Sequence, residues 1–235
     1  MIINKIRKGE HDVWNAFMIQ NAFFTKNDIP ISKESFSIPK QLIGWDEAKG
    51  LYKKLIKEDP EFKNKSFIHF YMDDQKFDGK KSSIWLYPKE ALEIIRHYAG
   101  IISPDFSTNF DLPIFIKGFN IYRMRAYDCF MELEHIPYIH NIRWGTKETW
   151  KYCFDGIPTG SVVAVGTVAS GLRRLENRKL FEDGFRKMVE VVKPKAIIIY
   201  GSSNYRVIKE ARDQGIKIIN FESKTSLAYK KNGGD

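Results

Sequence analysis

The chain has 235 residues, 43% of them hydrophobic, and its 38 basic and 29 acidic side chains give a formal net charge of +9. This length and composition suit one domain with a large core, or two small domains. No apolar run reaches the roughly 18 to 20 residues of a membrane-spanning helix, and residues 1–10 lack the apolar stretch of a signal peptide. We therefore expect no membrane partner and a cytoplasmic location.

The first 66 residues are predicted to form an irregular N-terminal part that packs on the same domain. Helices are expected at residues 12–24 and 46–57, and short strands at residues 28–32 and 41–44. If both short strands join the main sheet, it curls toward an incomplete or closed barrel; otherwise it stays an open sandwich.

From residue 67 to residue 229, β-rich runs alternate with helical patterns, as in βα units around a mainly parallel sheet. The strands are expected at residues 67–72, 100–103, 138–142, 161–166, 196–200 and 217–220. The helices are expected at residues 88–98, 112–134, 146–154, 175–192 and 204–214. We predict an α/β fold, either an incomplete TIM-barrel-like sheet or an open three-layer sandwich, with a frayed tail at residues 230–235.

Polar and glycine residues follow the ends of five consecutive predicted strands. Ligands bind at the carboxyl ends of parallel strands, because the loops there vary without disturbing the core. The polar, aromatic and glycine residues selected by this rule include Asp73, Asp74, Asp105, Ser107, Asn141, Arg143, Trp144, Thr167, Tyr200, Gly201 and Ser202.

The three aspartates allow two interpretations. Asp73, Asp74 and Asp105 are carboxylates of the kind that hold Mg²⁺ together with water and a substrate phosphate. Alternatively, Asp74 begins a turn and Asp105 caps the segment after Pro104.

Three arginines are candidates for binding anionic oxygens. Arg123 and Arg125 lie in the predicted helix 112–134, where two guanidinium groups suit a phosphate or carboxylate, although a solvated helix face is the more common explanation. Arg143 follows an apolar strand and precedes Trp144, whose ring either stacks on a base or packs on the next helix.

Net charge and the absence of common motifs give only broad indications of partners and chemistry. The excess of basic residues favours a nucleic acid or a nucleotide, since each phosphate contact releases counterions, but the charges are interspersed with acidic ones. Cys129 and Cys153 match no zinc or redox spacing, and P-loop, GxSxG and HExxH motifs are absent.

Six ordered motifs carry a family resemblance over about residues 68–221: HFYMDD, SPDFS, NxYRxRA, NIRWG, CFDGIP and IIIYG. Together they resemble a bacterial and phage family of unknown function with an FDG motif. The resemblance implies association with phages and mobile elements, and it brings no established activity. Its motif positions are Asp105, Arg123, Arg125, Asn141, Arg143, Trp144, Asp155, Gly156, Tyr200 and Gly201.

Asp155 and Gly156 lie in a turn that feeds the amino end of a strand, a position that indicates stability more than catalysis.

The leading hypothesis is an enzyme acting on a phosphate-bearing substrate, a nucleotide or nucleic acid. In it, Asp105 and Arg143 are catalytic, and Mg²⁺ is the metal considered. Substrate binding is assigned to Arg123, Arg125, Asn141, Trp144, Tyr200 and Gly201. A non-catalytic module for nucleic acid or another ligand is the alternative, and a toxin-like or defence protein is a third.

Overall fold

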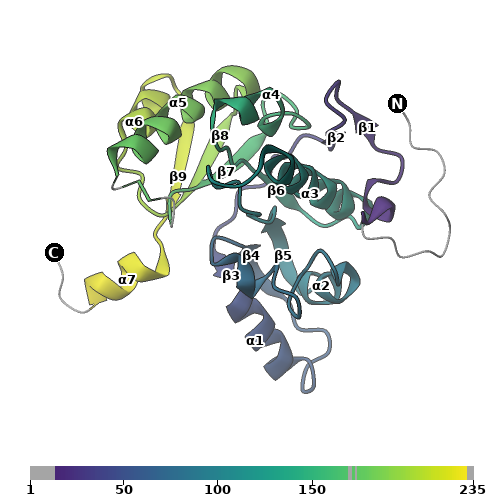
Figure 1. The fold of residues 1–235 in the computed structure, drawn as a ribbon. Coiled ribbons are helices and arrows are strands. Elements are labelled where there is room, and N and C mark those ends of the chain that lie inside the picture. The colour runs from purple at the N-terminus through teal and green to yellow at the C-terminus, as the bar shows by residue number, and fades with distance from the viewer. Residues whose placement is uncertain (1–13, 169–170, 173, 232–235) are drawn as a thin grey trace.

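The computed structural model describes residues 14–231 except 169–170 and 173. Its main sheet has seven parallel strands that neighbour one another in chain order (Figure 1). They are β3 (Leu42–Gly44), β4 (Asn64–His69), β5 (Tyr98–Ile102), β6 (Tyr138–Asn141), β7 (Val162–Gly166), β8 (Ala196–Tyr200) and β9 (Lys217–Phe221). The predicted parallel arrangement of the strands that follow residue 66 is confirmed.

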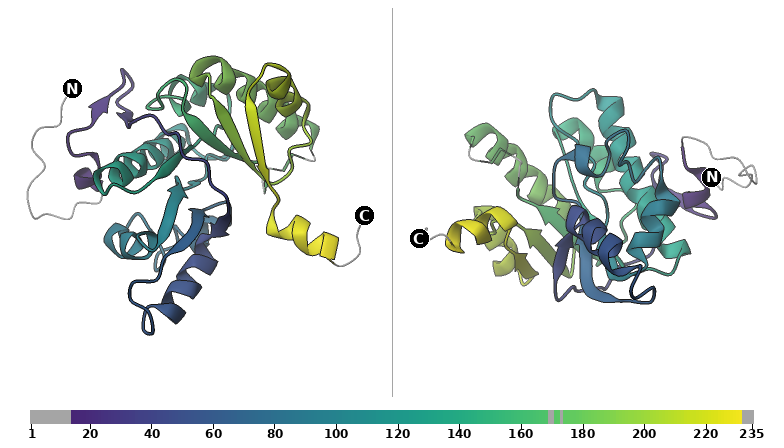
Figure 2. Two further views of the ribbon diagram at one scale, coloured as in Figure 1. Left: turned by 180° about the vertical axis from the view of Figure 1, so that it is seen from behind. Right: turned by 90° about the horizontal axis from the view of Figure 1, so that it is seen from below.

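Helices connect successive strands and cover the outer face of the curved sheet, as the two views of Figure 2 show. They are α1 (Trp45–Leu55), α2 (Pro88–Ile95), α3 (Ile114–Leu133), α4 (Trp150–Cys153), α5 (Leu175–Val192) and α6 (Arg206–Asp213), with α7 (Lys224–Lys231) following β9. Crossovers between adjacent parallel strands share one hand, so a sheet in chain order carries these helices on one side.

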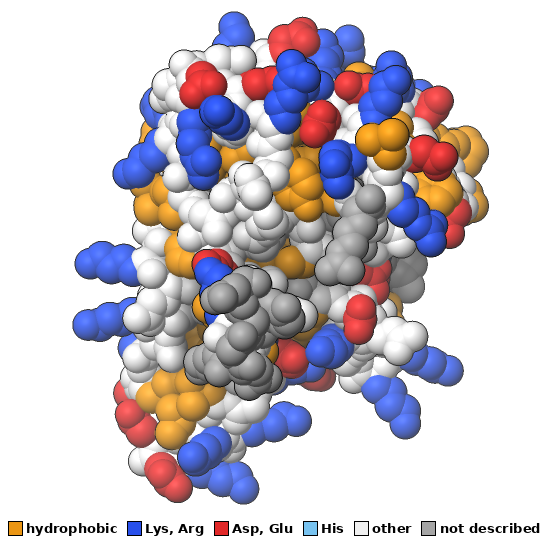
Figure 3. All heavy atoms as spheres, turned by 90° about the vertical axis from the view of Figure 1, so that its left-hand side faces the viewer, with side chains coloured by type: hydrophobic (Ala, Val, Ile, Leu, Met, Phe, Trp, Pro, Cys, Tyr) orange, Lys and Arg blue, Asp and Glu red, His pale blue; other side chains and the backbone are white. Residues whose placement is uncertain are grey.

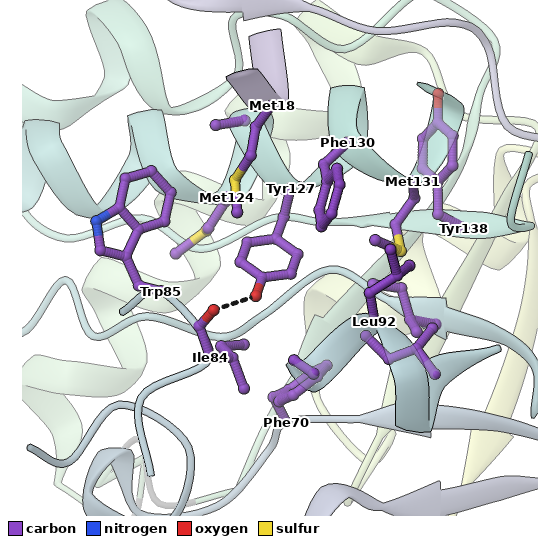
Figure 4. Packing of buried hydrophobic residues seen from close by; sticks show 14 of the residues in the cluster. Met18, Phe70, Ile84, Trp85, Leu92, Met124, Tyr127, Phe130, Met131 and Tyr138 are labelled. Carbon is purple, nitrogen blue, oxygen red and sulfur yellow. Dashed lines mark hydrogen bonds between the residues drawn. The ribbon is translucent and has the colours of Figure 1, made fainter. Parts of the chain in front are cut away.

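Side chains alternate between the two faces of the sheet, as the pleat requires. Phe67 and Tyr71 belong to the inner cluster, whereas Ile68 and Phe70 join the outer core against α1 to α3. Figure 4 shows this outer core, in which the buried Tyr127 hydroxyl donates to the Ile84 carbonyl at 2.5 Å. Both faces are therefore apolar, which explains the nearly continuous hydrophobic strands.

The sheet curls far enough for β4 and β8 to touch across its inner face. The rings of His69 and Tyr200 lie 4.1 Å apart between centroids, although β5, β6 and β7 separate their strands. In the sheet of the described residues, β3 and β9 remain edge strands. The architecture is an incomplete, curled parallel sheet covered by helices, within the predicted α/β class.

The segment between β2 (Pro30–Ile31) and β3 runs along the amino ends of the strands. Ser35 accepts from the Val162 amide at 2.7 Å through its carbonyl and donates from its hydroxyl to the Tyr138 carbonyl at 2.6 Å. Because this segment occupies the amino ends, the carboxyl ends are left for a ligand.

The predicted helix 12–24 is wrong over its described part. The chain forms a 3₁₀ turn at Ala16–Ile19 and then β1 (Phe23–Phe24), which pairs antiparallel with β2. Asn15 and Asn21 adopt left-handed backbone conformations, with φ of 52° and 62°, and these break a continuous helix. The strand predicted at 28–32 therefore lies outside the main sheet, which curls without it.

Two smaller differences concern helices. The predicted helix 146–154 is a 3₁₀ turn at Lys147–Thr149 followed by the short α4. The chain remains helical in α7 up to Lys231, past the start of the predicted tail, and residues 232–235 lie outside the described residues. None of the described helices is both long and apolar enough to cross a membrane.

Candidate functional site

Two hollows open at the carboxyl ends of the strands and share Asp105, Asn109 and Arg143. The first, of about 310 Å³, has an apolar side formed by Phe110, Ile142, Trp144, Val165, Leu172, Leu180 and Phe181. The second, of about 520 Å³, is more polar and is lined by Tyr71, Met72, Asp73, Asp74, Gln75, Ser107, Leu112 and Val168 as well as the shared residues.

Asp105 and Arg143 form an ion pair at this junction, through Asp105 Oδ2 and Arg143 Nη1. Asn141 Nδ2 donates to Asp105 Oδ1 at 2.9 Å, and the Tyr71 hydroxyl donates to Asn141 Oδ1 at 2.9 Å. Arg143 Nη2 also donates to Asn109 Oδ1 at 3.3 Å. A continuous hydrogen-bonded chain thus runs from β4 across the inner mouth of the sheet to the Asp105–Arg143 pair.

Gly166 makes room for the Tyr71 side chain. A Cβ at this position would lie 2.5 Å from Tyr71 Cδ1, closer than side-chain carbons approach one another. The Tyr71 ring also stacks on Tyr200, with centroids 5.2 Å apart and planes 14° apart. A glycine at the end of β7 therefore lets a tyrosine that follows β4 reach Asn141, the last residue of β6.

Burial sets the protonation of the groups around this chain. It raises the pKa of the Tyr71 hydroxyl well above its usual value, with Asp105 adding to the effect, so Tyr71 is a hydrogen-bond donor at neutral pH. Burial lowers the pKa of His69 to about 3, so its imidazole is neutral. Burial also raises the pKa of Asp74, against hydrogen bonds from Ser107 that favour the carboxylate.

Acidic groups outnumber basic ones around the hollows. Among the described residues that line them, Asp73, Asp74, Asp105 and Asp111 are acidic, and Arg143 alone is basic. Figure 3 shows basic side chains interspersed with acidic ones over one face of the molecule, as the sequence indicates. The positive excess of the chain therefore lies outside the hollows.

Arg125 lies apart from both hollows. Its guanidinium is fully buried and pairs with Asp128, and it also donates to the Asn141 carbonyl. The buried Asp128 carboxylate in turn contacts Ser103 and His140. Arg125 therefore supports the backbone at the end of β6 from behind and has no open path to a ligand.

Arg123 is also occupied behind the site. It pairs with Asp78 at 2.8 Å, donates to Asn120 Oδ1 at 2.6 Å, and lies over the Phe106 ring at 3.8 Å. Asn120 binds the Ser107 carbonyl through its side-chain amide, and Ser107 binds Asp74. Arg123 reaches the second hollow only through these neighbours.

Trp144, Tyr200 and Gly201 occupy three different environments. Trp144 lines the first hollow and stacks on Phe181 of α5, with ring centroids 5.5 Å apart. Tyr200 contacts Tyr71 and His69 on the inner face and lines neither hollow. Gly201 donates its amide to the Phe221 carbonyl at 2.8 Å, so its visible role is in strand pairing.

The FDG motif lies at the amino side of β7, where it holds the N-terminal hairpin. Asp155 accepts hydrogen bonds from Asn27 at 2.6 Å and from Thr25 at 3.2 Å. Gly156 has a φ of 75°, and a Cβ there would lie 2.2 Å from the Pro30 carbonyl oxygen. Only glycine fits that backbone and that contact, so the motif has a structural explanation.

The three aspartates do not converge into a ready-made metal centre. Within the described part of the chain, no three His, Cys, Asp or Glu side chains are grouped closely enough to hold a metal ion. Asp105 is engaged by Asn141 and Arg143, and Asp74 accepts from the Ser107 amide and hydroxyl. Asp73 and Asp74 still supply hard oxygen donors to the second hollow, a donor set that suits Mg²⁺ when a substrate phosphate completes it.

Several residues at the hollows were missed from the sequence. Tyr71 stands inside a predicted strand, where the strand-end rule does not select it. Asn109 and Phe110 follow the predicted strand end by several residues. Phe181 lies in the predicted helix 175–192, but helical periodicity does not reveal that its face borders a hollow.

Comparisons with known proteins place most of this structure in a described family. A family model described as a domain of unknown function (DUF4417) matches residues 22–222. The Gene 1 protein of Mycobacterium phage L5 is 28% identical over 194 residues, covering 82% of this chain and 79% of the relative. The Gene 1 protein of Mycobacterium phage D29 is 25% identical over 201 residues, covering 84% of this chain and 68% of the relative. No solved structure matches.

Proposed function

The chain belongs to the DUF4417 family, whose description names no activity, and we propose that it is an enzyme acting on a phosphate-bearing substrate of nucleotide size. The observation behind the proposal is the shared wall of the two hollows. Asp105, Asn109 and Arg143 border both, so a ligand that occupies both hollows lies across the ion pair.

The two hollows differ in a way that matches the two ends of a nucleotide. The first offers Trp144, Phe181 and Leu172 to a flat, apolar group such as a base. Arg143 stands between the hollows with its side chain 23% exposed, and a guanidinium binds phosphate oxygens through several donors. We assign the base to the first hollow and the phosphate to Arg143.

Because the second hollow is acidic, a phosphate bound beside it would need a divalent cation to offset the negative charge. Asp73 and Asp74 are the residues that would hold Mg²⁺ together with the substrate. The ion would neutralise negative charge on the phosphate. Without it, the surrounding carboxylates repel a phosphate.

The protein's own groups then have distinct roles. Asp105 holds the guanidinium of Arg143 in place, and Asn141 holds Asp105. Tyr71 fixes the Asn141 amide by donating to its oxygen, so Asn141 Nδ2 faces Asp105. Ser107 donates to both oxygens of Asp74 and so orients this carboxyl group in the second hollow.

One observation favours a non-catalytic ligand-binding module as the second candidate. The hydrogen bonds that link Tyr71, Asn141, Asp105 and Arg143 pair these side chains with one another and need no ligand. A purely structural network has the same property. A module of this kind would bind the same nucleotide without converting it.

Titration calorimetry with mononucleotides, with and without Mg²⁺, tests the proposal, and product analysis of the same mixtures separates enzyme from module. Arg143→Ala should weaken binding ~10- to 100-fold, the value of a charge-assisted hydrogen bond. Asp105→Asn should abolish turnover, with only a modest change in Tm for either variant. Arg206→Ala is the control, because its side chain is 81% exposed on α6 and borders neither hollow.

Three results would count against this assignment. Unchanged binding in Arg143→Ala removes the phosphate site. Unfolding of Arg143→Ala or Asp105→Asn makes the pair a structural salt bridge. Tight binding without product in the presence of Mg²⁺ supports the module.

A further inference from the structure

We propose that the substrate is single-stranded nucleic acid, and that its chain leaves the first hollow over an exposed aromatic ridge beside it. The ridge consists of Tyr87, Phe110, Ile114, Phe115 and Phe119. This inference deepens the proposed function, because it identifies the phosphate-bearing ligand as one unit of a longer strand.

The ridge is unusually exposed for its composition. Phe115 is 85% exposed and Phe110 is 62% exposed, and the other ridge residues also face solvent. Large apolar side chains that gather on a surface mark an interaction site more often than isolated ones do. Phe119 packs partly on the buried Trp85, whereas Phe110 and Phe115 are too exposed for the core to account for their rings.

The ridge is continuous with the first hollow. Phe110 lines that hollow and lies shortly before the start of α3 at Ile114. Phe115 and Phe119 are one turn apart on α3 and so share a face. The Phe119 ring contacts Trp85 at 5.8 Å, which brings the neighbouring Tyr87 segment to the same surface.

Exposed lysines lie on the two segments that contact the ridge. The segment that contains Trp85 and Tyr87 also carries Lys80, Lys81 and Lys89. On the other side, the Tyr152 hydroxyl reaches the Ile114 carbonyl at 3.5 Å, and its segment carries the exposed Lys147 and Lys151. The exposed acids on the same segments and on α2 are Glu90, Glu93, Asp111 and Glu148, against these five lysines.

Aromatic side chains between lysines suit a single strand better than a lipid surface or a second copy of this chain. Bases stack on exposed rings without regard to sequence, while the phosphates follow the positive flanks. The net charge of +9 also has to lie mainly outside the acidic hollows, where it attracts a polyanion. A duplex offers no unstacked bases to the ridge.

Fluorescence anisotropy with a labelled short oligothymidylate tests this inference on the full chain. Phe115→Ser combined with Phe119→Ser should weaken oligonucleotide binding on the order of tenfold or more, since two stacking contacts are lost. Binding of a mononucleotide should stay unchanged. Phe36→Ser is the matched control, since Phe36 is 60% exposed and belongs to the segment along the amino ends of the strands.

The arms of the experiment separate the alternatives. Oligonucleotide binding that the double variant leaves intact, or a duplex bound as tightly as the single strand, overturns the inference. Loss of a dimer in sedimentation, or of binding to anionic vesicles, without an effect on the oligonucleotide assigns the ridge to a second copy or a lipid surface. In a further outcome, the double variant loses oligonucleotide binding while Arg143→Ala binds mononucleotides normally. That result supports the ridge as a binding surface for a single strand and contradicts the assignment of the phosphate to Arg143.

Discussion

Asp74 is the carboxyl group of the hollows whose ionisation depends most clearly on the fold. It lies partly buried at the start of the loop after β4, where Ser107 donates to both of its oxygens. Burial outweighs these hydrogen bonds and raises its pKa above the usual 3.8. A carboxyl that keeps its proton to higher pH is useful in acid–base chemistry but costs stability when ionised.

The loss of folding stability on ionisation of Asp74 gives a prediction for Asp74→Asn. The unfolded chain releases the Asp74 proton near pH 3.8, and the folded protein releases it at higher pH. The folded state therefore binds more protons between these two values, and Asp74 lowers stability as the pH rises through that window. Relative to the native protein, Asp74→Asn should gain in Tm as the pH rises from below 3.8 toward neutrality. Thermal denaturation across this range measures it, and a pH-independent difference contradicts the raised pKa.

At the scale of elements, α3 fixes the loop that borders the second hollow. Arg123 holds Asp78 at 2.8 Å, and Asp78 accepts from the Ser83 hydroxyl at 2.9 Å. Both ends of the loop after β4 are thus fastened, one through Asp78 and the other through Asp74 and Ser107. In this structure Arg123 is a positioning residue.

Arg123→Met should destabilise the protein by about 3 kcal/mol, because it leaves the largely buried Asp78 carboxylate without its cation. Combining it with Asp78→Asn should restore part of that loss. Denaturant unfolding of both single variants and the double variant gives the coupling energy, expected at ~1–3 kcal/mol. Additive effects would show that the pair is not coupled.

At the scale of the whole molecule, the N-terminal part packs against the curled sheet at the amino ends of its strands. The hairpin β1–β2 is attached to the α4–β7 turn through Asp155, and the chain then follows the strand starts to β3. The candidate site lies at the other end of the same strands. The contacts that attach the N-terminal hairpin and the candidate site therefore lie at opposite ends of the strands.

Asp155→Ala should test this separation. It removes two hydrogen bonds from the hairpin and should cost about 1–2 kcal/mol, with faster proteolytic cleavage within residues 23–31. Nucleotide binding should not change, since the Asp155 side chain lines neither hollow. Asp213→Ala, an exposed acid at the end of α6, is the control. Loss of nucleotide binding in a folded Asp155→Ala variant would instead give the FDG motif a functional role.

Local patterning was sufficient for most of the strands and helices that follow residue 66. Strand β8 and helix α5 were predicted at their observed bounds, because an apolar run and a three- to four-residue period depend on near neighbours in sequence. Helix 12–24 failed because two asparagines adopt left-handed backbone, and the Asn15 side chain donates to the distant Trp85 carbonyl at 2.6 Å.

The same contrast holds for the site. The sequence alone placed Asp105, Asn141 and Arg143 at strand ends, because parallel strands bring their carboxyl ends to one edge. Only the tertiary structure showed that Arg123 and Arg125 are occupied behind that edge and that Tyr71 crosses it beside Gly166. These outcomes depend on the curl of the sheet and on contacts between residues far apart in the chain, which periodicity and spacing do not encode.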